Sequence, residues 1–424
     1  MPAPAQAPPS PAAASADSVD KILTALAAGH DGLVRTYAIG KSSGGRDLRV
    51  IEITNVRTRP AAEKPAIWID PGFRGDDPSA VEAVLALART LAENPAKDAR
   101  IDGILDRFTL FLMPQPNPGD ARAGVDLERN WPEGWLPDAP GNVGGSGGGP
   151  YPLSEPETRS VIDFLIERPH VAALLVLGGA GRSVRGPRIG ADRLSADDRA
   201  ALETLGSRIA AAAGRPWTAQ DPSLPPSNRA AWAVTQYGAW PIALGFRDLP
   251  ASSTSDPAPP PALPAEENAA VVNALAALAD ALPRIAVDTV TVTPLHAAVS
   301  AQRVEAEDGE TLTLHVLPAD ETTPKLLAEL RATVRNEGTL PTSPLGAPGA
   351  RPLPPIRVDF ESSANIARIT GEARHRLATL AGGESREFVW VVQMEGDSGW
   401  VRIRTVSAKG GVASRMLPIR LQTK

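Results

Sequence analysis

Short apolar runs alternate with amphipathic stretches along the chain as far as Pro283. Several of the apolar runs are rich in β-branched or aromatic residues, which is typical of buried strands, and they lie at 46–53, 65–70, 107–114, 171–179 and 241–246. Between them, apolar residues recur at helical spacing in 79–93, 154–168, 195–214 and 266–282. Strands that alternate with helices predict an α/β domain with a mostly parallel sheet, here over residues 17–283.

The helix predicted at 154–168 has a recognisable start. Ser154 and Glu157 have the spacing of a capping box, in which each side chain satisfies a free backbone N–H of the other residue. We therefore expect Ser154 to cap this helix.

From about Ile285 onward the pattern changes to a period of two residues. Apolar and polar positions alternate in stretches such as "DTVTVTP", "SREFVWVVQ" and "WVRIRTVSA", and Gly, Pro and Asp separate them. This pattern is the signature of an antiparallel β-sandwich. We predict a second, immunoglobulin-like sandwich domain over residues 285–424.

Composition removes some classes of function. The net charge is −6 and no cluster of Lys and Arg forms a phosphate-binding stripe, so nucleic acid is not an expected partner. No apolar run approaches the roughly 20 residues that cross a bilayer, so no membrane span is expected. The chain has no cysteine, which excludes disulfides, thiolate nucleophiles and cysteine-ligated zinc.

Residues 1–16 form a Pro/Ala-rich tract that predicts a disordered tail. The tract lacks the charged and apolar regions of a signal peptide, but it resembles the spacer that often follows a removed export signal. We therefore expect a secreted or periplasmic protein, with a disordered tail on a cytosolic protein as the alternative.

Ligands of open α/β sheets bind beyond the carboxyl ends of the strands. In this chain the loops at those ends are polar or rich in glycine, and they read "PGFRGDD", "QPNPGD", "GGAGRS" and "RDLP". A site built from these loops is the first place to look for chemistry.

Several separated motifs resemble those of the carboxypeptidase A-like zinc metallocarboxypeptidases, and they occur in that family's order. The motifs are "IGKSSGGRDLRVIEIT" (39–54), "NPGD" (117–120), "GVDLERNWP" (124–132) and "SEPET" (154–158). The resemblance covers the first domain only and implies an eight-stranded mixed sheet with flanking helices. The sandwich resembles the accessory β-domains of secreted hydrolases, which is a less specific match.

The resemblance implies a zinc site whose residues are changed here. Family members hold zinc with a His-x-x-Glu pair and a later His, and these positions correspond to Arg74, Asp77 and Gly178. Guanidinium has no lone pair to offer, and it would repel a dication about 4 Å away by about 8 kcal/mol at an effective dielectric near 20. We therefore predict that zinc is absent, that no other cofactor is present, and that Asp77 forms an ion pair with Arg74. The family's general base corresponds to Gly245, for which Asp248 is only a weak substitute.

At other positions of the site, the residues of this chain match the family's motif more closely. Arg129 matches the arginine that clamps the substrate carboxylate, a task that suits its forked guanidinium, although a structural salt bridge is an equal alternative. Arg122 matches a second arginine, and Glu128 replaces a neighbouring Asn, so that its charge is expected to weaken the clamp. Asp126 and Asn130 match as structural hydrogen-bonding residues.

None of the five histidines is expected at the site, and the "GGSGGG" segment at 144–149 lacks the strand and helix that a serine nucleophile requires. The favoured function is a non-catalytic pseudopeptidase that binds a peptide or a carboxylate-bearing ligand. One alternative is an active metallocarboxypeptidase or amidase with magnesium, calcium or manganese on oxygen ligands, drawn from Asp76, Asp77, Asp120 and Asp248. Another is an adhesion or carbohydrate-binding protein that acts through the sandwich.

Overall fold

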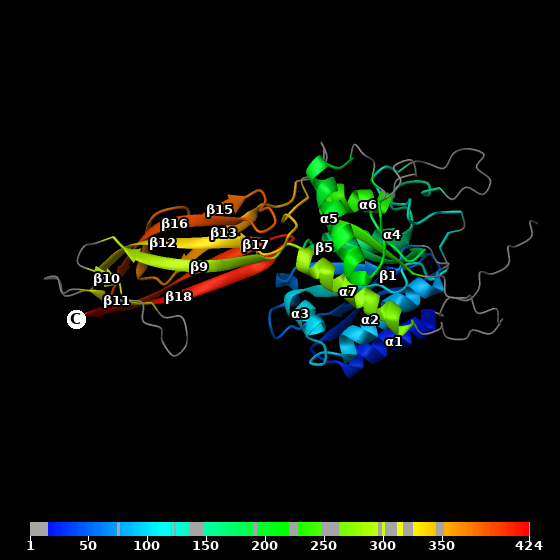
Figure 1. The fold of residues 1–424 in the computed structure, drawn as a ribbon, viewed down its shortest axis with the longest axis horizontal. Helices are drawn as coiled ribbons and strands as arrows, with labels where there is room; N and C mark the ends of the chain where they lie inside the picture. Colours follow the sequence, from blue (N-terminus) through cyan, green and yellow to red (C-terminus); the bar gives the residue numbers. More distant parts are fainter. Residues whose placement is uncertain are drawn as a thin grey trace, which may run out of the picture. The chain divides into compact units, whose positions relative to one another are not determined.

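The computed structural model describes residues 16–73, 77–119, 121–122, 124–135, 147–187, 189, 193–219, 228–246, 263–295, 299–301, 312–316, 325–344 and 352–423. The chain divides into two compact units (Figure 1). The first comprises Met1–Ala281 with Pro344–Pro352, and the second comprises Leu282–Ser343 with Leu353–Lys424.

The first unit is built on an eight-stranded mixed sheet with the order β1-β2-β4-β3-β5-β8-β6-β7. Its strands are β1 (Val34–Lys41), β2 (Asp47–Ile53), β3 (Ala66–Asp70), β4 (Thr109–Leu112), β5 (Val171–Ala180), β6 (Val184–Arg185), β7 (Trp217–Thr218) and β8 (Trp240–Phe246). The central strands β4, β3, β5 and β8 run parallel, whereas β1 pairs antiparallel with β2, β2 with β4, and β6 with β8. This confirms the predicted α/β class and the mostly parallel sheet.

Helices flank this sheet. They are α1 (Ala16–Gly29), α2 (Pro78–Glu93), α3 (Ala99–Arg107), α4 (Pro156–Ile166), α5 (Ala196–Ala213), α6 (Asn228–Trp232), which continues as a π-helical segment (Ala233–Tyr237), and α7 (Ala265–Ala281). Helix α7 packs against α2, α3 and α5, so these four form one layer (Figure 1). Helix α4 and the residues after α6 share a core with Trp68 and Phe111 of the sheet.

The start of α4 differs from the prediction. The helix begins at Pro156 with Glu155 at its cap position, and no side chain caps it. The Ser154 hydroxyl accepts a hydrogen bond from Asn130, and the Glu157 carboxylate accepts from the backbone N–H and the hydroxyl of Ser43. The predicted capping box is therefore wrong, because tertiary contacts use both side chains.

The second unit contains two β-sheets (Figure 1). The six-stranded sheet has the order β10-β11-β18-β17-β13-β15, and the four-stranded sheet has the order β14-β16-β12-β9. The strands are β9 (Ile285–Pro294), β10 (Val299–Ala301), β11 (Leu312–Val316), β12 (Lys325–Asn336), β13 (Ile356–Ser362), β14 (Ile366–Thr370), β15 (Arg374–Leu377), β16 (Ser385–Glu395), β17 (Ser398–Ser407) and β18 (Gly411–Thr423). Leu330 and Trp390 of one sheet share a buried core with Val358 and Ile403 of the other, which confirms the predicted sandwich.

Among the helices that the structure describes, none combines the length and the apolar character that crossing a bilayer requires.

Candidate functional site at the carboxyl ends of the central strands

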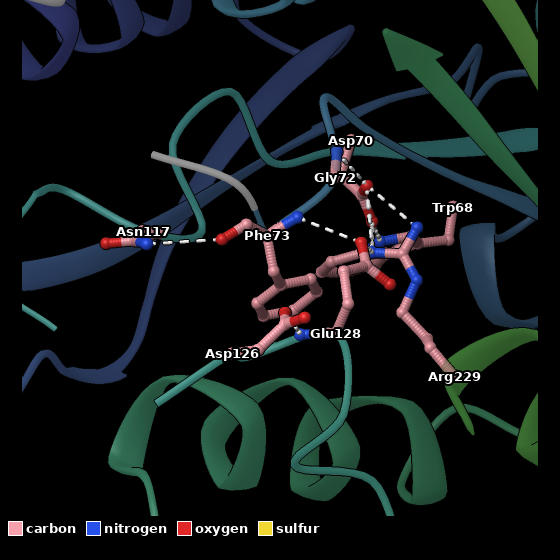
Figure 2. Close-up of polar contacts among 8 residues, drawn as sticks. All are labelled: Trp68, Asp70, Gly72, Phe73, Asn117, Asp126, Glu128 and Arg229. Carbon is pink, nitrogen blue, oxygen red and sulfur yellow. Dashed lines mark hydrogen bonds and ion pairs between the residues drawn. The ribbon is translucent and has the colours of Figure 1, made fainter. Parts of the chain in front are cut away.

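A buried carboxylate organises the turn that follows β3. Asp70 accepts hydrogen bonds from the indole N–H of Trp68 at 2.5 Å and from the backbone N–H of Gly72 at 2.7 Å (Figure 2). Gly72 has a φ of +86°, a conformation that residues with a side chain rarely adopt. The turn that leads toward residue 74 therefore has a fixed shape.

Arg229, at the start of α6, pairs with this carboxylate. Its two terminal nitrogens lie 3.1 Å from the Asp70 oxygens, and its side chain is only 4% exposed. Arg229 also lies 3.7 Å from Glu128 and stacks over the ring of Phe73. Burial by itself lowers the pKa of Arg229, but the charges of Asp70 and Glu128 more than offset it, so the pKa lies above its usual value. No sequence motif indicates Arg229, because its partner Asp70 lies 159 positions away.

Glu128 belongs to the same network (Figure 2). One of its oxygens accepts a hydrogen bond from the backbone N–H of Phe73 at 3.1 Å, while Asn117 donates to the Phe73 carbonyl at 3.1 Å. The structure thus places Glu128 against Phe73 and Arg229, whereas we expected its charge to act on the neighbouring Arg129. Two residues of the segment that follows β4, Asn117 and Glu128, thus hold Phe73, the residue directly before position 74.

The predicted clamp residues lie on the surface. Arg129 is 51% exposed at its side chain, and its Nε lies 3.6 Å from Asp126. Arg122 is also exposed, and its carbonyl closes a turn by accepting from the N–H of Val125. Asn130, by contrast, is buried and hydrogen-bonds the Ser154 hydroxyl, which fits the structural role expected for it.

Asp77 and Gly178 come together, as the family resemblance implies. One Asp77 oxygen caps α2 by accepting from Ala80 N at 3.0 Å, and the other accepts from Gly179 N at 3.3 Å. Arg74, Asp76, Asp120 and Asp248 lie outside the described residues, so the proposed Arg74–Asp77 ion pair stays a prediction.

Two further arginines contact the strand ends where the family has its last ligand and its base. Arg185 donates to the carbonyl of Gly178 at 2.5 Å, and Arg215 donates to the carbonyl of Gly245. Arg215 is buried and pairs with Glu267. Burial lowers the pKa of Arg215, and the charge of Glu267 opposes that shift. Sequence reasoning missed these contacts, since a hydrogen bond from a guanidinium to a backbone carbonyl leaves no pattern of residue types in the sequence.

The described residues at these positions do not suit zinc. Gly178 and Gly245 offer no side chain, and both oxygens of Asp77 already accept backbone N–H groups. Within the part of the chain that the structure describes, no group of three or more His, Asp or Glu residues could hold a metal ion. Zinc prefers four tetrahedral ligands, of which protein side chains supply at least three.

Comparisons with known proteins agree on one family for the first unit. A family model described as zinc carboxypeptidase matches residues 19–240, and a model for a domain of unknown function matches residues 312–418. Rat carboxypeptidase A2 is 28% identical over 183 residues, which is 36% of this chain and 41% of the relative. Carboxypeptidase SOL1 of Arabidopsis thaliana is 30% identical over 153 residues, which is 34% of this chain and 29% of the relative. The chain thus spans less than half the length of these relatives.

A solved structure supports the fold of the first unit. The crystal structure of carboxypeptidase A from Helicoverpa armigera aligns with a TM-score of 0.51 and 20% sequence identity. The alignment covers 63% of this chain and 74% of that chain. At this identity the likeness concerns the fold alone.

Proposed function

This chain belongs to the zinc carboxypeptidase family, and from that premise we propose that its first unit is a non-catalytic relative. Its zinc ligands and its general base are lost, and it binds a peptide or another ligand that carries a carboxylate. The observation that carries the proposal is the state of the described ligand and base positions. Asp77 is engaged by two backbone N–H groups, and glycine stands at positions 178 and 245.

The retained arginines support carboxylate binding. A guanidinium binds a carboxylate through two parallel hydrogen bonds, which neither water nor a lysine can reproduce. Arg129 now lies 3.6 Å from Asp126, but both side chains are partly exposed, and an exposed ion pair of this kind contributes only about 0–1 kcal/mol. A ligand carboxylate can therefore compete for Arg129. Arg122 lies exposed in the turn that precedes this segment.

We further propose that the protein needs no metal or other cofactor and acts outside the cytoplasm. The first point follows from the poor fit of the donors to zinc, and the second from the composition of residues 1–16.

Calorimetric titration tests the binding. The probe is an N-acetylated tripeptide that ends in phenylalanine, used with a free C-terminal carboxylate and, separately, with a C-terminal amide. We expect the free acid to bind and the amide not to bind. Arg129→Ala should weaken binding of the free acid by about 10-fold or more, since a charge-assisted hydrogen bond contributes about 1.5–3 kcal/mol.

Arg100→Ala is the matched control. Arg100 is 54% exposed, close to the value for Arg129, and it also pairs with an aspartate, Asp98, away from the site. Its loss should leave the titration unchanged. A peptide-hydrolysis assay with added zinc, cobalt or manganese provides a second test. Metal-dependent turnover would show that the protein is catalytic and that the proposal is wrong.

A further inference from the structure

We propose that this chain's own backbone, together with the Cβ atom of Ala80, fills the space in which the family's third zinc ligand and its general base would stand. The proposal rests on the proposed function and specifies which part of the site a ligand can reach. Ligands then reach the exposed side chains of Arg122 and Arg129 and do not reach the ends of β5 and β8. Restoring the family's residues would then not restore a metal site.

Gly178 has no room for a side chain. A Cβ atom added there would lie 2.8 Å from the carbonyl oxygen of Pro71 and 2.9 Å from the Cβ of Ala80, closer than real Cβ atoms approach. The backbone torsions of Gly178 would accept a side chain, since its φ lies outside the left-handed region. The obstacle is therefore space.

The two obstructing atoms are held firmly. Pro71 lies between Asp70 and Gly72, whose mutual hydrogen bond belongs to the buried Arg229 network. Ala80 lies in the first turn of α2, and its backbone N–H is bound by the Asp77 cap. To admit an imidazole at position 178, both of these anchored segments, or the end of β5 itself, would have to move.

The next residue offers no alternative. Gly179 has a φ of +91°, which strains any residue with a side chain, and a Cβ there would overlap the guanidinium of Arg185. A shift of one residue along β5 therefore does not recover the third ligand.

The position of the base is closed in the same way. A Cβ on Gly245 would overlap the carbonyl oxygen of Gly181 and would lie 3.2 Å from the carbonyl oxygen of Gly179. Both obstructing atoms belong to the backbone, so no side-chain rotation relieves the contact. The N–H of Gly245 also donates to the carbonyl of Ser183 at 2.9 Å, and its own carbonyl accepts from Arg215, which fixes this end of β8 on both sides.

Gly→Ala substitutions measure the space directly. We expect Gly178→Ala and Gly245→Ala each to lower the Tm by roughly 2–10 °C, the size of an overpacking defect in a unit of this length. Gly29→Ala is the matched control, because nothing lies within 4 Å of its added Cβ and its φ is ordinary. Its Tm should stay within about 2 °C of the wild type. If Gly178→Ala and Gly245→Ala melt like Gly29→Ala, the space exists and the proposal is wrong.

Zinc titration of two revertants measures the consequence. One carries Arg74→His and Asp77→Glu, and the other adds Gly178→His. We expect no stoichiometric zinc binding by either, measured by calorimetry and by metal analysis after gel filtration. Unfolding of the triple variant while the double variant stays folded also supports the proposal, since the imidazole added at position 178 is then the cause. A folded triple variant that binds one zinc ion would overturn it.

These measurements are independent of the peptide titration. The wild type can fail to bind the free-acid peptide while Gly178→Ala still has a lowered Tm. Conversely, the wild type can bind the peptide while the Tm of Gly178→Ala equals that of the wild type. The two proposals can therefore fail separately.

Discussion

Replacement of Arg229 by methionine should destabilise the first unit strongly. The guanidinium makes three 3.1 Å contacts with the Asp70 oxygens, and the exposed fractions of the two side chains are 4% and 1%. At this distance the pair attraction is about 5 kcal/mol at an effective dielectric of 20. Removal of one partner leaves Asp70 buried without its counter-charge and close to a second anion, Glu128. We expect a loss of about 3–5 kcal/mol in the free energy of unfolding.

Urea unfolding, followed by tryptophan fluorescence, measures this loss. Arg107→Met is the matched control, because Arg107 pairs with Asp280 at 3.2 Å on the surface, with 37% and 48% of the side chains exposed. That variant should lose less than about 1 kcal/mol. The double variant Arg229→Met with Asp70→Asn should recover at least about 1 kcal/mol relative to Arg229→Met, since it removes the orphaned charge. Equal losses for Arg229→Met and Arg107→Met would show that the buried pair contributes no more to stability than an exposed one.

Three further outcomes test other parts of the structure. The ammonium of Lys64 is buried, which lowers its pKa from 10.5 to about 8. Between these two pH values the unfolded chain binds a proton that the folded chain has lost, so the stability of the wild type relative to Lys64→Met should rise with pH, by at most about 3 kcal/mol. A difference in urea midpoints that stays flat or falls as pH rises would contradict this. Asp77→Ala removes the cap of α2 and the hydrogen bond to Gly179, so its free energy of unfolding in urea should fall by about 1–2 kcal/mol. Asp77→Asn keeps an acceptor oxygen and should lose less. Equal losses for the two variants would argue against the cap. In the second unit, the two N–H groups of the buried Asn336 amide are shared among three backbone carbonyl oxygens that lie 2.8–3.2 Å from the amide nitrogen. Asn336→Ala should therefore lose about 3 kcal/mol in thermal or urea unfolding, and a loss below about 1 kcal/mol would show that the amide is dispensable.

The sequence predicts the central strands and the long helices because burial leaves a direct trace in the pattern. The runs at 65–70 and 171–179 correspond to β3 and β5, and the stretches at 79–93 and 195–214 correspond to α2 and α5. The helices at Ala16–Gly29 and Ala99–Arg107 are absent from the prediction, which assigned no helical pattern to those segments. Hydrophobic periodicity therefore predicts the architecture better than the number of elements.

The site is less predictable, because its contacts join residues that are far apart in the chain. Ser154 and Glu157 have the spacing of a cap, yet Asn130 and Ser43 bind them instead. Glu128 directly precedes Arg129, but its partner Arg229 comes from α6. Local rules describe only the preferences of a segment, whereas a buried charge or an unmet hydrogen bond is satisfied by whichever group the fold brings near.

We propose that this relative of zinc carboxypeptidases binds a carboxylate without a metal. A calorimetric titration of the free-acid tripeptide into protein kept in EDTA tests it most directly. We expect the same affinity in EDTA as in buffer that contains zinc, and we expect to recover the peptide intact afterwards. Binding that appears only with zinc, or a shortened peptide in that sample, would contradict it.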